Sequence, residues 1–104
     1  MTILKLSPEQ IEETTKLGNA MIVDFWAPWC GPCRAFGPIF EEACKRHPEV
    51  MFVKVNIDDF QKFALKEKIT SIPTVWAYKD KERVYAEPGA LTADELDKLA
   101  ESLE

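Results

Sequence analysis

Residues 20–33, AMIVDFWAPWCGPC, decide the fold of this 104-residue chain. The run 20–26 is apolar except for Asp24, which is typical of a strand buried on both faces of a parallel or mixed sheet. Cys30 and Cys33 follow at the start of the next predicted helix, whose apolar side chains form one stripe. The stretch therefore predicts a strand-to-helix junction that carries two thiols on one helical turn.

The two thiols lie in the predicted first turn of a helix, a position that favours a reactive cysteine. The N–H groups of the first helical turn have no intrahelical partner, and the helix dipole is positive there. A thiolate at Cys30 is therefore stabilised, and we expect its pKa to fall below the free value of about 8.5. Cys33 lies one turn further on the same face, where it can attack a mixed disulfide formed by Cys30. Pro32 stiffens this turn, and Gly31 leaves the sulfur accessible.

Two inert cysteines, or half of a zinc site, are the alternative interpretations. A structural zinc site usually needs four ligands, and the only other cysteine and histidine are Cys44 and His47. Cys44 lies about 16 Å beyond Cys33 along the predicted helix, so one chain cannot close such a site and we expect no metal. Cys44 falls on the apolar stripe and is predicted to be core, with a regulatory thiol as the alternative. His47 is predicted to be a surface charge or a cap at the end of that helix.

Periodicity and turn residues predict alternating strands and helices, which indicates the α/β class. Capping boxes are predicted at Ser7–Gln10 and Thr92–Glu95, and Asp58 or Asp59 is expected to cap the third helix. The hairpin turn around Asp80 lacks glycine, so we expect Asp80 to take the left-handed conformation. The expected strands are 2–6, 20–26, 50–57, 74–78 and 82–86, and the expected helices begin at Pro8, Cys30, Asp58 or Asp59, and Thr92.

The motif Trp29-Cys30-Gly31-Pro32-Cys33, with Asp24 upstream and Ile72-Pro73 downstream, resembles the active site of the thioredoxin family. The likeness extends over nearly all of the chain. It implies a thioredoxin fold, with a five-stranded mixed sheet in the order 1-3-2-4-5 flanked by four α-helices. The first three strands would be parallel and the hairpin antiparallel to them. We expect residues 1–104 to form a single thioredoxin domain.

Asp24 has two interpretations from the residues alone. It is either a carboxylate on a solvated strand face or a desolvated group whose pKa is raised, which suits a general acid/base serving Cys33. The thioredoxin resemblance implies the second role. The resemblance also implies that Lys54 lies beside this carboxylate as an auxiliary residue. From the sequence alone, Lys54 could also be a solvated lysine at the end of a strand.

The resemblance also implies a substrate-binding surface beside the cysteines. A cis bond before Pro73 would turn the backbone of Ile72 outward, where it can pair with an extended segment of a client protein. Trp29 is expected to be partly exposed, whereas Trp76 is expected to be core. The flat apolar surface would consist of Trp29, Gly31, Pro32, Ile72, Pro73, Gly89 and Ala90. Pro88 before Gly89 departs from the family pattern and is expected to stiffen that loop.

Composition and charge narrow the partners and the compartment. A net charge of −5 argues against nucleic acid or an anionic membrane as the main partner. The N-terminal residues 1–8 turn polar at once, so we expect no signal peptide, and no stretch resembles a membrane span. Three cysteines are too few for a disulfide scaffold and fit a reducing interior. We therefore expect a cytoplasmic protein, and we expect it to be a monomer.

These observations predict a general protein-disulfide reductase that acts as an electron donor and serves cell redox homeostasis. Cys30 would attack a client disulfide, and Cys33 would resolve the mixed disulfide with help from Asp24. By resemblance, no cofactor is bound, and a flavoprotein reductase would recycle the disulfide with electrons from NADPH. An oxidase or isomerase is one alternative, disfavoured because Gly31-Pro32 brings no charge between the cysteines. A binding subunit whose redox activity is incidental is the other.

Overall fold

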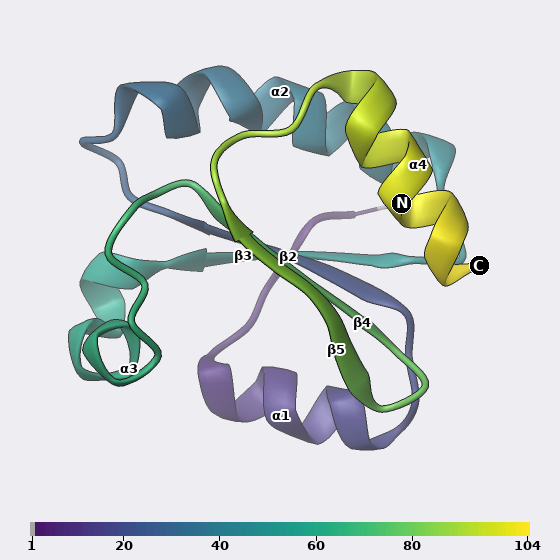
Figure 1. Cartoon of the computed structure of the whole chain (residues 1–104), viewed down its shortest axis with the longest axis horizontal. Coiled ribbons are helices and arrows are strands. Elements are labelled where there is room, and N and C mark those ends of the chain that lie inside the picture. Colours follow the sequence, from purple (N-terminus) through teal and green to yellow (C-terminus); the bar gives the residue numbers. More distant parts are fainter. Residues whose placement is uncertain (1) are drawn as a thin grey trace.

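The computed structural model describes residues 2–104, which form a twisted five-stranded sheet with two helices on each face (Figure 1). In chain order the elements are β1 (Leu4–Lys5), α1 (Pro8–Lys16), β2 (Met21–Trp26), α2 (Gly31–Arg46), β3 (Met51–Asn56), a 3₁₀ turn (Ile57–Asp59), α3 (Gln61–Lys66), β4 (Thr74–Lys79), β5 (Glu82–Pro88) and α4 (Ala93–Leu103).

The strand order is β1-β3-β2-β4-β5, which confirms the expected topology. β3 pairs in parallel with both β1 and β2, and β4 runs antiparallel to β2. β5 is antiparallel to β4 and therefore follows the direction of the first three strands. The expectation that both hairpin strands oppose the first three is wrong for β5, because a hairpin reverses the chain between its own two strands. The active-site helix α2 begins just beyond the C-terminal end of the central strand β2.

Local side-chain chemistry fixes the helix starts. Both predicted capping boxes are present: Ser7 Oγ accepts from the Gln10 N–H at 3.1 Å, and Thr92 Oγ1 accepts from the Glu95 N–H at 3.1 Å. The prediction of a cap at Asp58 or Asp59 is wrong. The side chain of Asn56 caps a 3₁₀ turn there, and α3 begins afterwards without a side-chain cap.

The hairpin turn between β4 and β5 is left-handed at two residues. Asp80 has a φ of 52°, as predicted, and Lys81 follows with a φ of 73°. Positive φ at both central residues matches the twist of the flanking strands in a two-residue hairpin, which is why the turn closes without glycine.

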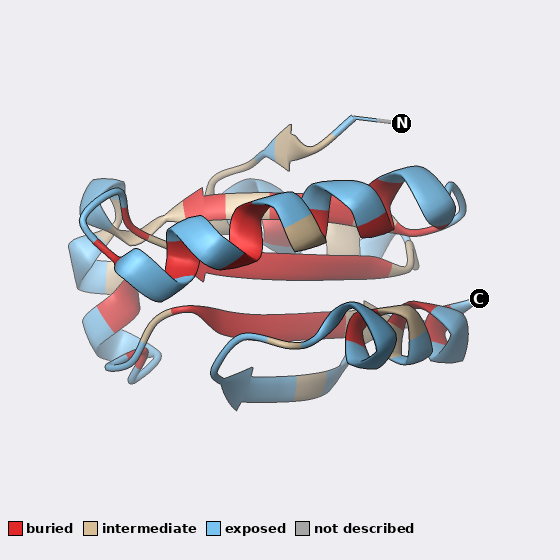
Figure 2. Ribbon diagram, turned by 90° about the horizontal axis from the view of Figure 1, so that it is seen from above, coloured by how far each residue is buried: buried red, intermediate tan, exposed pale blue. Residues whose placement is uncertain are grey.

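The core consists of two layers, one on each face of the sheet. Figure 2 looks onto the face that α2 and α4 cover, with the buried central strands behind these helices. One layer packs under α2 and α4 and includes Ile22 of β2; the other packs over α1 and α3 and includes Val23 of the same strand. Side chains alternate between the faces along a strand, so Asp24 lies on the same face as Ile22, beneath α2. The predicted core positions Cys44 and Trp76 are confirmed, since they are 2% and 7% exposed.

His47 is also buried, so the prediction of a surface charge is wrong for this residue. It is only 7% exposed at the C-cap of α2, where its ring contacts Asp97 of α4 and Glu104, the C-cap residue of α4. The half of the prediction that placed it at a helix cap is confirmed.

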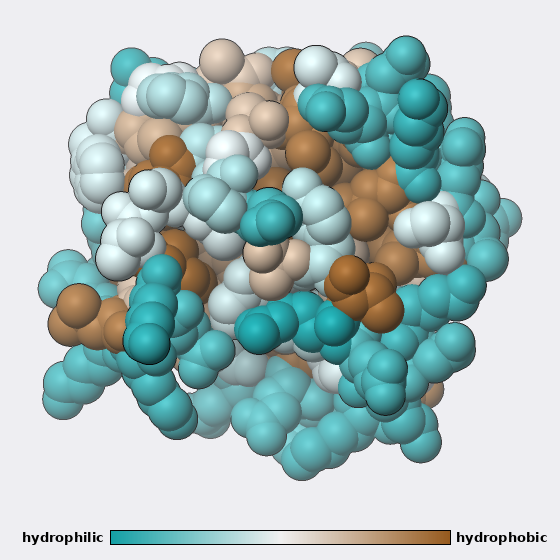
Figure 3. All heavy atoms as spheres, in the orientation of Figure 1, coloured by the Kyte–Doolittle hydropathy of each residue, from teal (hydrophilic) through white to brown (hydrophobic). Residues whose placement is uncertain are grey.

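In the space-filling view of Figure 3, hydrophilic residues form most of the rim, and apolar side chains show through over the middle of the face. Among residues 2–104, none of the helices combines the length and the apolar character needed to cross a bilayer. The large apolar side chains that are exposed in this part of the chain are Leu17, Trp29, Leu65 and Val84.

Candidate active site

The two cysteines of the motif form a disulfide at the start of α2. Cys30 is the N-cap residue, and Cys33 stands in the first turn, with 5.2 Å between their Cα atoms. The N–H of Cys33 donates to the Sγ atom of Cys30 at 3.2 Å. This N–H is one of the donors that a helix start leaves without a backbone partner, so it stabilises negative charge on the Cys30 sulfur once the disulfide opens. The sequence prediction of the helix start is confirmed.

The loop before β4 faces the disulfide. The peptide bond between Ile72 and Pro73 is cis, as the resemblance implied, and the carbonyl oxygen of Ile72 lies 3.6 Å from Cys30 Sγ. The Gly89 N–H donates to the carbonyl of Pro73 at 2.7 Å and holds the end of β5 against this loop. Gly89 has a φ of +100°, a conformation that other residues rarely adopt. Ala90 is exposed next to it.

Trp29 offers an apolar surface directly beside the nucleophile. Its side chain is 66% exposed, although its indole N–H donates to Asp58 Oδ1 at 3.1 Å. In the same loop, the carbonyl of Pro28 accepts a hydrogen bond from Arg34 Nη1 at 3.0 Å. Sequence reasoning missed the role of Asp58, because its contact with Trp29 joins positions 29 residues apart and leaves no periodic signal.

Asp24 is fully buried, and neither carboxylate oxygen has a hydrogen-bond partner within residues 2–104. Burial raises the pKa of Asp24 from 3.8 to about 7, and the positive charge of Lys54 opposes part of this rise. The desolvated interpretation of this residue is therefore the correct one. A carboxyl group with a pKa near neutrality can both release and accept a proton under working conditions.

Lys54 lies beneath α2 on the strand next to Asp24. The two residues are paired in the register of β2 and β3. The Nζ atom of Lys54 lies 4.7 Å from the ring centroid of Trp26, and a Cβ atom added to Gly37 of α2 would lie 3.9 Å from it. The lysine is thus held against an aromatic ring and the active-site helix, where its charge acts on Asp24.

The remaining predicted site residues fall where the motif places them. Gly31 and Pro32 are the first two residues of α2, and both are exposed. Ile72 packs against the cluster that contains both cysteines. No group of three or more His, Cys, Asp or Glu side chains in residues 2–104 is arranged to hold a metal ion.

Comparison with known proteins assigns the family. The sequence model named Thioredoxin matches residues 2–102. The chain belongs to the thioredoxin family. Thioredoxin from Mycoplasma genitalium is 42% identical over 74 residues, which are 71% of this chain and 72% of that protein. Putative thioredoxin 2 from Streptomyces coelicolor is 38% identical over 88 residues, or 85% of this chain and 66% of that one.

Solved structures agree with this assignment of family and fold. Oxidised thioredoxin from Plasmodium falciparum superposes with a TM-score of 0.80 at 33% identity, covering 97% of both chains. Thioredoxins are dithiol/disulfide oxidoreductases, and the Cys30–Cys33 pair makes this chain one of them. The redox-active group of a thioredoxin is this disulfide itself, so the family needs no bound cofactor.

Proposed function

We propose that this thioredoxin is a general reductase of protein disulfides. The observation that carries the proposal is the Cys30–Cys33 disulfide at a helix N-terminus, with Cys30 Sγ 3.6 Å from the carbonyl oxygen of Ile72. This arrangement places the reactive sulfur beside backbone that a client polypeptide can pair with. The client is therefore a protein with an accessible disulfide.

The reaction transfers two electrons from the dithiol to the client. The thiolate of Cys30 attacks one client sulfur, which forms a mixed disulfide and releases the other client sulfur as a thiolate. Cys33 then loses its proton and attacks the Sγ atom of Cys30. This second step breaks the mixed disulfide, releases the second client thiolate and leaves the Cys30–Cys33 disulfide. The two client thiolates take up protons as they leave.

Asp24 acts in the second step as the proton acceptor for Cys33. It lies under the helix that carries Cys33, has no competing hydrogen-bond partner in the described chain, and has a pKa of about 7. Once Cys33 has reacted, Asp24 returns the proton to a departing client thiolate or to solvent. The charge of Lys54 lowers the Asp24 pKa, so part of the Asp24 population is ionised near neutral pH.

The client-binding surface surrounds the disulfide. Trp29 supplies an exposed aromatic face, and Ile72 and Pro73 supply the edge along which an extended segment binds. Gly89 and Ala90 flank this edge, and they leave room for the client backbone because Gly89 has no side chain and Ala90 has only a methyl group. Gly31 and Pro32 form the exposed rim of the helix start.

We further propose that a flavoprotein reductase recycles the disulfide with electrons from NADPH, and that this thioredoxin works as a single-domain monomer in the cytoplasm. Cys44 supports a reducing compartment, because it is a free thiol outside the active pair. The sequence suggests the same compartment through its low cysteine content.

Trapping variants test the order of the two cysteines. Cys33→Ser is expected to accumulate a mixed disulfide through Cys30 when mixed with a disulfide-containing protein such as insulin, because nothing resolves it. Cys30→Ser is expected to form no adduct at position 30 and to lose insulin reduction. Mass spectrometry identifies the linked cysteine, and Cys44→Ser serves as the control for the third thiol. An adduct that forms only in Cys30→Ser would reverse the proposed roles.

A redox equilibrium with glutathione tests the direction of the reaction. A reductase requires a Cys30–Cys33 potential more negative than that of the glutathione couple. A less negative potential would make the protein an oxidant or isomerase, even if both trapping results hold.

A further inference from the structure

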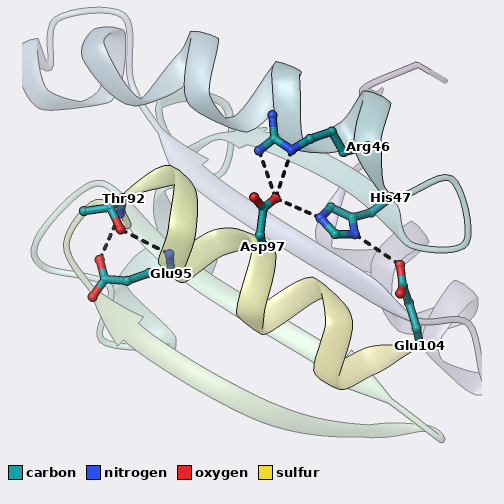
Figure 4. Close-up of polar contacts among 6 residues, drawn as sticks. All are labelled: Arg46, His47, Thr92, Glu95, Asp97 and Glu104. Atoms are coloured by element: carbon teal, nitrogen blue, oxygen red, sulfur yellow. Dashed lines mark hydrogen bonds and ion pairs between the residues drawn. The ribbon is translucent and has the colours of Figure 1, made fainter.

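A buried histidine joins the two helices on one face of the sheet (Figure 4). His47 ends α2, and its side chain is 8% exposed. Its Nε2 atom lies 2.8 Å from Asp97 Oδ1, and its Nδ1 atom lies 3.1 Å from Glu104 Oε1. Asp97 belongs to α4 and Glu104 caps its C-terminus, so a single ring contacts α4 at two points about two turns apart.

The donor and acceptor chemistry of this contact fixes the charge of the ring. A carboxylate oxygen only accepts hydrogen bonds, whereas a neutral imidazole donates from one nitrogen and accepts at the other. With a carboxylate at each nitrogen, a neutral His47 would point a lone pair at one of the two oxygens. Only the imidazolium donates to both Asp97 and Glu104.

Arg46 adds a second cation to this cluster. Arg46 donates to Asp97 Oδ1 from Nε at 3.1 Å and from Nη2 at 2.9 Å. Asp97 thus accepts hydrogen bonds from Arg46 and from His47, and these contacts lower the pKa of Asp97. Within residues 2–104, the ion pairs of the His47 ring are those with Asp97 and Glu104. The C-terminal end of the α2 dipole also favours a cation at this position.

We propose that His47 is a pH-sensitive clasp: as an imidazolium it fastens the C-terminal helix α4 to the end of α2, and on losing its proton it releases one of the two contacts and loosens α4. The clasp lies at the opposite end of α2 from Cys30. The helix has 16 residues, so about 24 Å separate its ends. The clasp therefore acts on the docking of α4 and leaves the disulfide chemistry unchanged.

The direction of the pH effect follows from linkage. Burial alone would lower the His47 pKa, but the hydrogen bonds and charges of Asp97 and Glu104 outweigh it, so the net pKa is raised above 6.5. The contribution of the clasp to stability is fully present below the unfolded pKa of about 6.5, and it is lost as the pH rises through the folded pKa.

Nuclear magnetic resonance of the ring tests the charge directly. His47 is the only histidine of the sequence, so an untagged ¹⁵N-labelled protein gives one unambiguous ring spectrum. At pH 6 both nitrogens should show imidazolium shifts, and the titration midpoint should lie above 6.5. Glu104→Gln removes one partner and should lower that midpoint by roughly half a unit, the size expected for a partly exposed ion pair. Glu101→Gln makes the same charge change on α4 at an exposed position and serves as the matched control.

Hydrogen exchange tests the loosening. Amide protection, corrected for the intrinsic pH dependence of exchange, is compared between pH 6 and pH 8.5 for α4 and β2. In the wild type the protection of Leu96, Ala100 and Leu103 should fall about fivefold relative to that of β2, and in His47→Gln the ratio should not change with pH. Insulin reduction should be equal in the two proteins.

Several outcomes would overturn the clasp. A midpoint at or below 6.5 or a neutral single tautomer at pH 6 would do so, as would equal midpoint shifts in Glu104→Gln and Glu101→Gln. A protection ratio between α4 and β2 that stays constant in the wild type would show that deprotonation acts on the whole fold and not on the docking of α4.

Discussion

Replacing Asp24 by asparagine tests what its burial does to stability. The pKa of Asp24 is about 7 in the fold against an ordinary value of 3.8, because burial outweighs the charge of Lys54. Between these two pH values the folded protein binds this proton and the unfolded chain does not. The free energy of unfolding therefore falls as the pH rises through this window, and it levels off above it. About three pKa units, at about 1.4 kcal/mol each, correspond to about 4 kcal/mol.

Asparagine keeps the shape of the side chain and cannot ionise. We therefore expect Asp24→Asn to be more stable than the wild type by about 4 kcal/mol at pH 8 and nearly equal to it at pH 3. Urea unfolding of the oxidised proteins at pH 3, 5.5 and 8 measures the difference. Asp59→Asn, at an exposed position, controls for the loss of one negative charge. Equal stabilities of Asp24→Asn and the wild type at pH 8 would refute the reasoning, because the ionised carboxylate would then be solvated or fully compensated.

The same variant separates stability from chemistry. Without an ionisable group at position 24, the proton of Cys33 loses the acceptor that we propose for it, and resolution of the mixed disulfide should slow. The resolution rate is measured by stopped-flow fluorescence against pH. If Asp24→Asn is more stable at pH 8 but resolves the mixed disulfide as fast as the wild type, the burial argument holds and the proposed proton transfer is wrong.

Two further predictions concern packing and backbone conformation. Because Cys44 is buried and its pKa is raised by that burial, a thiol reagent should modify it slowly in the native protein and quickly in urea, and Cys44→Ala should keep full activity while losing about 1–2 kcal/mol of stability. Lys81 has a φ of 73°, so Lys81→Gly should raise the free energy of unfolding by about 0.5–1 kcal/mol. The control Lys98→Gly lies inside α4 and should lower the free energy of unfolding. A loss of stability in Lys81→Gly would show that the side chain of Lys81 matters more than its backbone conformation.

Local signals made much of the fold predictable. The apolar run interrupted by Asp24 identified the central strand, and the capping boxes at Ser7 and Thr92 identified two helix starts, because each signal lies within a few residues. The position of Cys30 at a helix N-terminus needed only the motif and the stripe that follows it. The strand order came from the family resemblance, since alternation of strands and helices alone does not determine which strands are neighbours.

Contacts between distant segments were not predictable in the same way. His47 looked like a surface group because its partners Asp97 and Glu104 lie 50 and 57 residues further along the chain. Asp58 looked like a helix cap, but it lies in a 3₁₀ turn and accepts the indole N–H of Trp29. In both cases the tertiary structure supplied a partner that no periodicity of the sequence encodes.

Two titrating groups are associated with α2. Asp24 takes part in the proposed proton transfer, and His47 affects the stability of the fold. Asp24 lies beneath the helix that carries the cysteines. Above about pH 7 its ionised carboxyl group, which has no hydrogen-bond partner within residues 2–104, removes about 4 kcal/mol from a net stability that is typically only about 5–15 kcal/mol. An apolar side chain like those of its strand neighbours would avoid this loss, so the carboxyl group is best explained by proton transfer.

At the far end of α2, His47 stabilises the fold only while it is charged, whereas Asp24 is well tolerated only while it is neutral. Both have a raised pKa, so proton loss at either end destabilises the folded state. The effect of Asp24 is nearly complete by about pH 7, whereas that of His47 develops above pH 6.5, and single substitutions at the two ends therefore change different parts of the same stability profile.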